Sequence, residues 1–160
     1  MIVLVIDVQN EANQFDAAFM IHVTMNVAEK KGLFAEAGRV VKPRGKLVLW
    51  EIFKTPEPEL TYPVPWAEDE SFSFLIPMAE MVALIAAAGF SPLRVDDATA
   101  EAAAWVRARL APKQDRRPRL PRPDLDLVLN NFRQKRANLS KSLLRGAVGV
   151  LRAVAVKNNG

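Results

Sequence analysis

Residues 15–53 read FDAAFMIHVTMNVAEKKGLFAEAGRVVKPRGKLVLWEIF, and this stretch decides the fold. Residues 15–22 form a near-continuous apolar run, which is long enough for a strand buried on both faces. Residues 27–41 repeat apolar side chains at close to the period of an amphipathic helix, and a Pro-Arg-Gly turn then ends that helix, since glycine permits a positive φ. Residues 46–53 form a second apolar run. Strand, helix and strand in this order predict a βαβ unit with two parallel, neighbouring strands.

This stretch resembles the middle of a class I S-adenosylmethionine-dependent methyltransferase of the small-molecule type. In that family a strand opening Phe-Asp, here Phe15 and Asp16, leads into a helix that ends in a Lys-Pro-Gly-Gly-like turn. Here the turn, residues 42–45, reads Lys-Pro-Arg-Gly, so Arg44 replaces one glycine of the usual pair. The resemblance implies an α/β fold: a partial Rossmann-like domain with a mostly parallel sheet, a C-terminal antiparallel strand and helices on both faces.

The glycine-rich turn of that family has no counterpart in this sequence. Its seven glycines lie at positions 32, 38, 45, 89, 146, 149 and 160, and no two of them form Gly-x-Gly. Such a turn lets the backbone approach the cofactor closely. We therefore expect residues 1–160 to form one incomplete methyltransferase-like domain. It resembles the family's C-terminal portion, its S-adenosylmethionine site is incomplete, and it need not be active alone.

The outer edge of the strand over residues 15–22 would then lack its usual partner. An unpaired strand edge exposes a row of N–H and C=O groups and promotes association between chains. Residues 1–8 are rich in β-formers, and we expect them to fold onto this edge. If they do not, the edge provides a route to self-association.

The resemblance implies a site at the carboxyl ends of the strands, where ligands bind in open α/β sheets. The residues that it assigns to the cofactor are Asp7, Val8, Met20, Ile21 and His22. The Asp7 carboxylate would accept the adenine amino group, although an ordinary strand-end aspartate is an equal interpretation. His22 is a candidate proton acceptor, because histidine ordinarily titrates near pH 6.5; the alternative is a hydrogen-bonded loop histidine.

A long irregular segment, residues 54–76, follows the second strand and is rich in proline, glutamate and aromatics. Proline restricts it to turns and extended pieces, and long loops of this kind are usually lids or binding loops. We expect a lid over the substrate, with Tyr62 and Trp66 as substrate contacts together with Asn26, which is also a candidate catalytic residue. The alternative is that the aromatics only attach the loop to the body of the domain.

The remaining chain predicts a helix over residues 77–88 closed by Gly89, a strand over 92–95, and a helix over 100–110 capped by Asp97 and Thr99. An exposed Arg/Pro-rich connector follows over residues 111–123, and its PxxP pattern is weaker evidence for a ligand motif than for a linker. A helix from Asp124 to residue 144, a break at Gly146 and a closing strand over 148–156 complete the prediction.

Composition limits the function classes. The chain contains no cysteine and one histidine, so neither a disulfide framework nor a multi-histidine metal site is expected. No apolar run approaches the roughly 18 residues of a membrane span, and the first residues lack a basic secretory leader. We therefore expect a cytoplasmic protein with a small-molecule methyl acceptor as its partner.

Charge is divided unevenly along the chain. The first 100 residues carry 8 Lys+Arg and 14 Asp+Glu, and the last 60 carry 14 and 4. The alternative function is therefore a non-catalytic interaction module, in which the basic C-terminal region binds an acidic partner or nucleic acid. Nucleic acid is disfavoured because the charges are interrupted by prolines and lack interleaved aromatics for base stacking.

Overall fold

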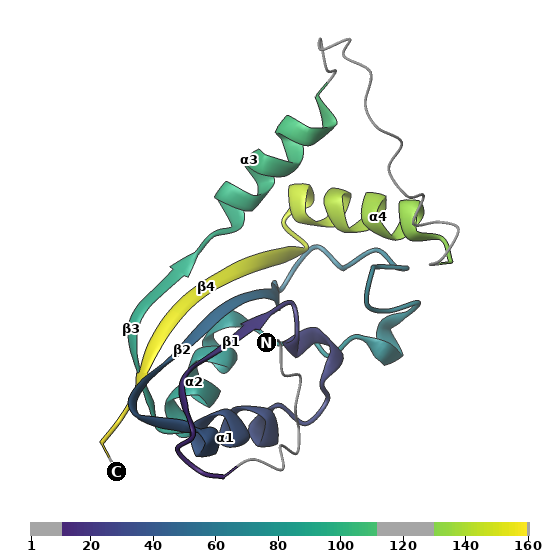
Figure 1. Ribbon diagram of the computed structural model, residues 1–160. Helices are drawn as coiled ribbons and strands as arrows, with labels where there is room; N and C mark the ends of the chain where they lie inside the picture. The colour runs from purple at the N-terminus through teal and green to yellow at the C-terminus, as the bar shows by residue number, and fades with distance from the viewer. Residues whose placement is uncertain (1–10, 112–129, 160) are drawn as a thin grey trace, which may run out of the picture.

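The computed structural model describes residues 11–111 and 130–159 (Figure 1). Its elements, in chain order, are β1 (Phe15–Ile21), a 3₁₀ turn (Thr24–Asn26), α1 (Lys30–Val40), β2 (Val41–Lys54), a second 3₁₀ turn (Glu70–Phe72), α2 (Met78–Ala87), β3 (Phe90–Asp97), α3 (Thr99–Leu110), α4 (Phe132–Arg145) and β4 (Val148–Lys157). No helix in these two ranges is long and apolar enough to cross a bilayer.

The four strands form one sheet in the order β1-β2-β4-β3. β1 and β2 are parallel, with Ala17 opposite Lys46 and Ile21 opposite Trp50. β4 lies between β2 and β3 and is antiparallel to both, so the other three strands share one direction (Figure 1). The predicted βαβ unit and the predicted C-terminal antiparallel strand are therefore confirmed.

One face of the sheet is packed tightly against α1 and α2. Side chains alternate between the two faces of a strand, and the odd-numbered positions of β2 point to this side. Leu47 and Leu49 are 0% and 1% exposed, and α1 places Phe34 against them at 0% exposure. The apolar side chains that repeat with the helical period in α1 pack in this layer, and α2 adds Met81 and Ile85 to the same core.

The other face is covered only near the carboxyl end of β2. There, α3, α4 and parts of the segment before α2 pack over Ile52, Val148 and Val150. On β1, the side chains of Phe19 and Ile21 are 45% and 57% exposed on this face. The expectation that this first strand is buried on both faces is wrong. Among the described residues only β2 pairs with β1, and no described helix covers this part of the sheet. Residues 1–8, expected on its outer edge, lie outside the described range.

The turn predicted over residues 42–45 lies within β2 rather than before it, because α1 already ends at Val40 and β2 begins at Val41. It forms an irregularity in the pairing with β1, and Arg44 rather than Gly45 takes the positive φ. Arg44 has a φ of 64°, whereas Gly45 does not adopt a positive φ. Gly45 is needed for space instead, because an added Cβ would lie 2.8 Å from the carbonyl oxygen of Lys42 and 2.9 Å from that of Asp16. The turn thus presses the backbone of β2 against β1, while Arg44 adopts a conformation that usually favours glycine.

Two helix boundaries also needed correction. α1 begins at Lys30 rather than at residue 27, with the Glu29 carboxylate accepting from the backbone N–H of Gly32. Of the helix expected over residues 124–144, the structure describes α4, which begins at Phe132 after Asn131 with a φ of 55°; residues 124–129 lie outside the described residues. The end of α4 at Gly146, with a φ of 80°, is as predicted. The connector beyond Ala111 lies outside the described residues.

Candidate functional site

The loop that follows β1 is held by hydrogen bonds to a buried carboxylate on β2. Glu51 is 0% exposed. Its carboxylate oxygens accept hydrogen bonds from the backbone N–H of Val23 at 2.9 and 3.1 Å and of Thr24 at 3.1 Å, and from the Thr24 hydroxyl at 2.9 Å. These four hydrogen-bond contacts hold the loop after β1 in one conformation.

Burial raises the pKa of the Glu51 carboxyl, while the hydrogen bonds from Val23 and Thr24 and the nearby Lys30 ammonium act in the opposite direction. Lys30 is itself 5% exposed and donates to the carbonyl of Val27 at 2.7 Å. Burial lowers the pKa of its ammonium. Glu51 was not among the predicted site residues, although a carboxylate inside the apolar run LVLWEIF was a visible sign of it.

His22 begins this loop in a left-handed conformation, with a φ of 54°. Its backbone N–H donates to the carbonyl of Trp50 at 3.0 Å, which continues the pairing of β1 with β2 by one residue. The side chain keeps an exposed surface, yet its neighbours remove enough water to lower the pKa of the imidazole below 6.5. Near pH 7 the ring is therefore neutral and able to accept a proton.

Asn26 closes the loop rather than reaching outward. Its side-chain amide donates to the carbonyls of His22 and Val23 at 3.5 and 3.4 Å, which are long contacts. Met20 is 8% exposed and faces the α1 side, whereas Ile21 points to the open face. Asp7 and Val8 lie outside the described residues.

An apolar cavity of about 470 Å³ lies beside His22. It is enclosed by β2, β4, α3 and α4, and we call it the apolar cavity. Its lining residues are His22, Trp50, Ile52, Glu101, Ala102, Trp105, Val106, Arg136, Leu139, Ser140, Leu143, Val148 and Val150. Of these only His22 was predicted as a site residue, because α3 and α4 are distant in sequence from β1 and β2.

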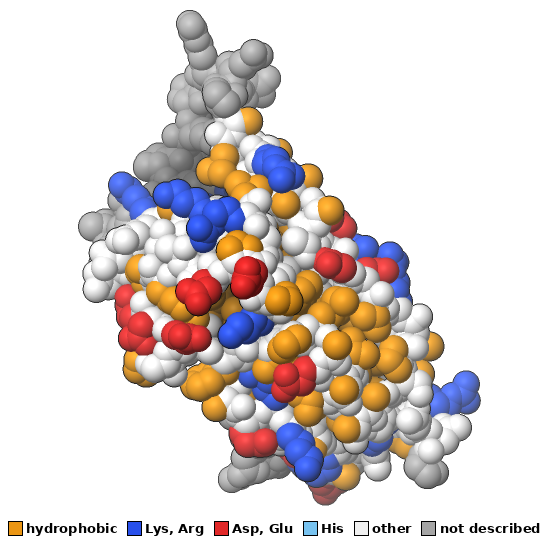
Figure 2. Space-filling view, turned by 180° about the vertical axis from the view of Figure 1, so that it is seen from behind, with side chains coloured by type: hydrophobic (Ala, Val, Ile, Leu, Met, Phe, Trp, Pro, Cys, Tyr) orange, Lys and Arg blue, Asp and Glu red, His pale blue; other side chains and the backbone are white. Residues whose placement is uncertain are grey.

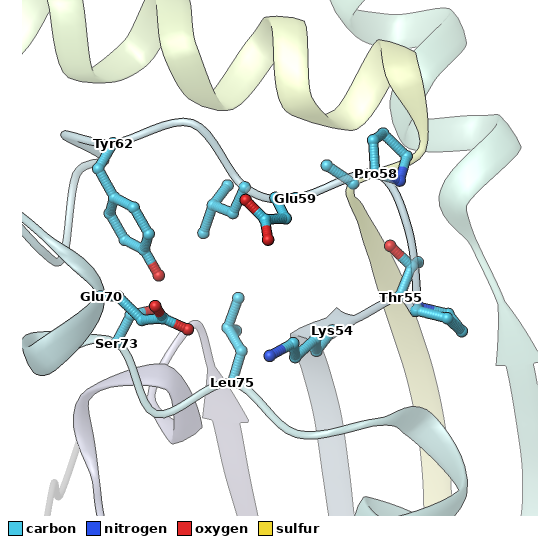
Figure 3. A pocket seen from close by; sticks show the side chains of 11 residues that line it. Lys54, Thr55, Pro58, Glu59, Tyr62, Glu70, Ser73 and Leu75 are labelled. Carbon is cyan, nitrogen blue, oxygen red and sulfur yellow. The ribbon is translucent and has the colours of Figure 1, made fainter.

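A second, more polar cavity of about 260 Å³ lies within the segment that joins β2 to α2, and we call it the loop cavity. Figure 3 shows the Tyr62 hydroxyl, the Glu59 and Glu70 carboxylates and the Lys54 amine directed into it. Burial raises the pKa of the Tyr62 hydroxyl. Tyr62 therefore lines a different cavity from His22.

Trp66 lines neither cavity. Its indole N–H donates to the Ser73 hydroxyl at 3.0 Å, and its ring packs with the second core cluster near Leu143. The structure thus places the three predicted substrate contacts, Asn26, Tyr62 and Trp66, in three separate surroundings.

The segment over residues 54–76 is attached at several points to α4 and to the loop after β1. The backbone N–H of Thr61 donates to the Ser142 hydroxyl, and Asn138 donates to the carbonyl of Pro63 at 3.0 Å. Phe74 donates its backbone N–H to the carbonyl of Met25. Figure 2 shows acidic side chains gathered on its left side. Within the segment, the Glu68 carboxylate forms an ion pair with Lys135 on α4.

Within the described residues, no group of three or more His, Asp or Glu side chains is arranged to hold a metal ion. The carboxyl ends of β1 and β2 thus carry a fixed loop and His22, which lines the apolar cavity. This arrangement is typical of the class of open α/β folds that bind a ligand at the carboxyl ends of their strands.

Comparison with known proteins agrees with this class. Residues 3–49 match the family model described as a methyltransferase domain. No curated protein matches the chain significantly. The predicted resemblance to class I S-adenosylmethionine-dependent methyltransferases is confirmed by this match together with the fold of the solved structures described next.

Geranyl diphosphate C-methyltransferase from Streptomyces coelicolor, solved with Mg²⁺, geranyl diphosphate and S-adenosyl-L-homocysteine, superimposes with a TM-score of 0.65 at 16% identity, covering 95% of this chain and 50% of that one. Phosphoethanolamine N-methyltransferase 2 from Haemonchus contortus, in complex with S-adenosyl-L-methionine, has a TM-score of 0.61 at 18% identity, covering 93% and 34%. The cyclase SpnF has a TM-score of 0.57 at 17% identity, covering 97% and 55%. The chain thus spans about half the length of these proteins or less.

Proposed function

We propose that this chain is the acceptor-side part of an S-adenosylmethionine-dependent methyltransferase that acts on a small molecule. The observation that carries the proposal is the parallel β1–β2 pair, whose carboxyl ends hold a loop fixed by Glu51 beside a cavity that His22 lines. The neighbours that bind S-adenosylmethionine or S-adenosylhomocysteine support the choice of cofactor. Their acceptors, geranyl diphosphate and phosphoethanolamine, support a small-molecule substrate.

The residues present fit one side of the cofactor. The backbone at Met20 and Ile21 lies at the strand end and would face the methionine part, with His22 beside it; Asp7 would accept the adenine amino group, and Val8 is a further cofactor contact. The sequence provides no Gly-x-Gly turn for the remaining contacts. We therefore propose that these residues alone form an incomplete cofactor site, and that full activity requires the contacts they lack.

S-adenosylmethionine, when bound, supplies a methyl group on a sulfonium, which is already a good leaving group, so that positioning supplies most of the rate enhancement. The loop held by Glu51 would fix the strand-end backbone on which that positioning depends. The neutral His22 imidazole would accept the proton that the acceptor's nucleophile loses as the new bond to carbon forms. The segment over residues 54–76 would close the acceptor side as a lid.

Calorimetric titration of the chain with S-adenosylmethionine tests this proposal. We expect saturable binding with a dissociation constant in the micromolar range, and competition by S-adenosylhomocysteine. Thr24→Val, which removes one of the contacts to Glu51 and loosens the loop, should weaken binding, whereas Thr55→Val, outside that loop, should not. Absence of saturable binding, or equal binding by both variants and the parent chain, would contradict the assignment.

The second candidate function is an interaction module that uses the basic C-terminal region. Within α4, however, Lys135 pairs with Glu68 and Arg145 donates to the Thr61 hydroxyl at 2.7 Å, which uses part of the charge inside the chain. Binding to polyanions alone, weakening steeply with salt, would favour this function. Self-association through the outer edge of β1, which no described strand pairs with, is a related proposal, and sedimentation velocity of the same samples tests it.

A further inference from the structure

We propose that the apolar cavity binds the methyl acceptor, and that this acceptor is a small molecule with an apolar body and a single anionic group, which Arg136 binds. The assignment rests on the proposed function, because it names the substrate class of the same site. It follows from the lining of the cavity, from the charges around it and from the position of His22 at its edge.

The cavity is built to hold an apolar body. Its volume of about 470 Å³ falls in the range of roughly 300–1,000 Å³ that is typical of small-molecule sites. Its walls come from four elements: Trp50 and Ile52 on β2, Val150 on β4, Trp105 on α3 and Leu139 on α4. Trp105 is 61% exposed, so a ligand that covers its ring removes apolar surface from water.

The charges around the cavity leave one cation without a carboxylate. The Glu101 carboxylate forms an ion pair with the Arg152 guanidinium at 3.2 Å, and the same guanidinium lies 3.2 Å from the Asp96 carboxylate. Arg136 has a different environment. Its guanidinium lies 5.8 Å from the centre of the Phe132 ring on the same helix, and it forms no ion pair with any described residue. Arg136 thus carries a positive charge at the cavity with which no carboxylate of the described residues pairs.

An anionic group complements this arrangement. The arginine fork matches the geometry of carboxylate and phosphate oxygens, and binds them with two parallel hydrogen bonds. Ser140, one turn further along α4, also lines the cavity and offers a hydroxyl donor near the same position. The loop cavity is smaller and contains the carboxylates of Glu59 and Glu70, which would repel an anionic ligand.

His22 connects this cavity to the reacting end of the sheet. Arg136 and Ser140 approach from α4, and His22 approaches from the loop after β1. A molecule held at α4 by its anionic group would thus extend its apolar body across Trp50 toward the strand end. There the methyl group would be delivered, under the proposed function, and the imidazole would receive the proton.

Nuclear magnetic resonance of the indole N–H groups tests the proposal directly. The chain contains three tryptophans, of which Trp50 and Trp105 line the apolar cavity and Trp66 does not. Four probes with one shared body separate the contributions: naphthoate, naphthyl phosphate, neutral naphthol and cationic naphthylmethylammonium. We expect both anionic probes to shift the Trp50 and Trp105 signals saturably, to leave Trp66 unchanged, and to bind about tenfold more tightly than naphthol.

Charge-neutralising variants on α4 provide the control. Arg136→Gln should abolish the preference for the anionic probes, while leaving the affinity for naphthol unchanged. Lys141→Gln removes the same charge from the same helix at an exposed position outside the cavity, and should change neither. The relative affinity of naphthoate and naphthyl phosphate indicates which anionic group the acceptor carries.

Three outcomes would overturn the assignment: equal affinity for anionic, neutral and cationic probes, an unchanged preference in Arg136→Gln, or no shift at Trp50 and Trp105 with any probe. These samples contain no S-adenosylmethionine. Failure here can therefore be distinguished from failure of the cofactor titration, which tests the strand end rather than the cavity.

Discussion

The two faces of the sheet are made from the same strands and differ in what covers them. On the face toward α1 and α2, Leu47 and Leu49 are 0% and 1% exposed. On the opposite face Val48, which lies between them in sequence, is 39% exposed, and its neighbour Phe19 on β1 is 45% exposed. Because successive side chains of a strand point to opposite faces, neighbouring residues alternate between the packed face and the open face.

The packed face of the sheet contributes to stability, and the opposite face contains the cavity proposed as the ligand site. The packed face is a closed apolar core, whose free-energy contribution comes from burial. The apolar cavity lies on the open face, where α3 and α4 bend over the carboxyl end of β2 without filling the space between them. The surface that is incompletely covered is therefore the surface available to a ligand.

The largest expected effect comes from substituting adjacent residues on β2. Leu49→Ala should lower the free energy of unfolding by about 3 kcal/mol, because it leaves a cavity in a packed layer. Val48→Ala, one residue away on the open face, should cost less than about 1 kcal/mol. Urea denaturation followed by circular dichroism measures both. Similar losses in the two variants would show that the open face is covered in solution.

The carboxylate that joins β2 to the loop after β1 gives the next effect. Glu51→Gln replaces one acceptor oxygen by an NH2 group, which takes the Oε1 position that accepts from the N–H of Val23, because the other oxygen has three donors; the change should cost about 2 kcal/mol. Glu57→Gln, at an exposed position, should have no measurable effect.

The pH dependence of this variant is an additional test. Because burial raises the pKa of Glu51 above its ordinary value near 4.5, its titration contributes stability that is present below pH 4.5 and lost as pH rises through the folded pKa. The difference in stability between the parent chain and Glu51→Gln should therefore narrow as pH increases from 4.5. A difference that widens with pH would show that the hydrogen bonds outweigh burial.

The turn over residues 42–45, near the start of β2, gives the smallest effects, of opposite sign. Arg44→Gly should stabilise the chain by up to about 1 kcal/mol, since Arg44 occupies a left-handed conformation in which side chains are disfavoured. Gly45→Ala should destabilise it, because the added methyl meets the backbone carbonyls of Lys42 and Asp16. Thermal denaturation of the two variants tests whether the backbone conformation favours glycine at position 44 and whether the lack of space requires it at position 45.

The sequence predicted the fold well because its local patterns agree with the tertiary structure. The apolar runs, the helical period before residue 42 and the break at Gly146 each depend on neighbouring residues, and each corresponds to an element of the structure, although α1 and β2 begin at other residues than expected. The site was predicted only in part. His22 could be found because it lies at the end of an apolar run that predicts a strand, whereas Trp105 and Arg136 line the same cavity from helices that begin more than 70 residues later.

By itself, the sequence determined the βαβ unit, the closing strand and the helix that ends at Gly146, while the antiparallel direction of that strand was implied by the family resemblance. Hydrophobic period and turn residues act over a few neighbouring positions and therefore remain readable along the chain. Only the tertiary structure decided which strand face stays open, that Glu51 holds the loop after β1, and that His22 and Tyr62 line separate cavities. Those outcomes depend on which distant side chains meet and how much water they exclude, and spacing along a single chain does not encode either.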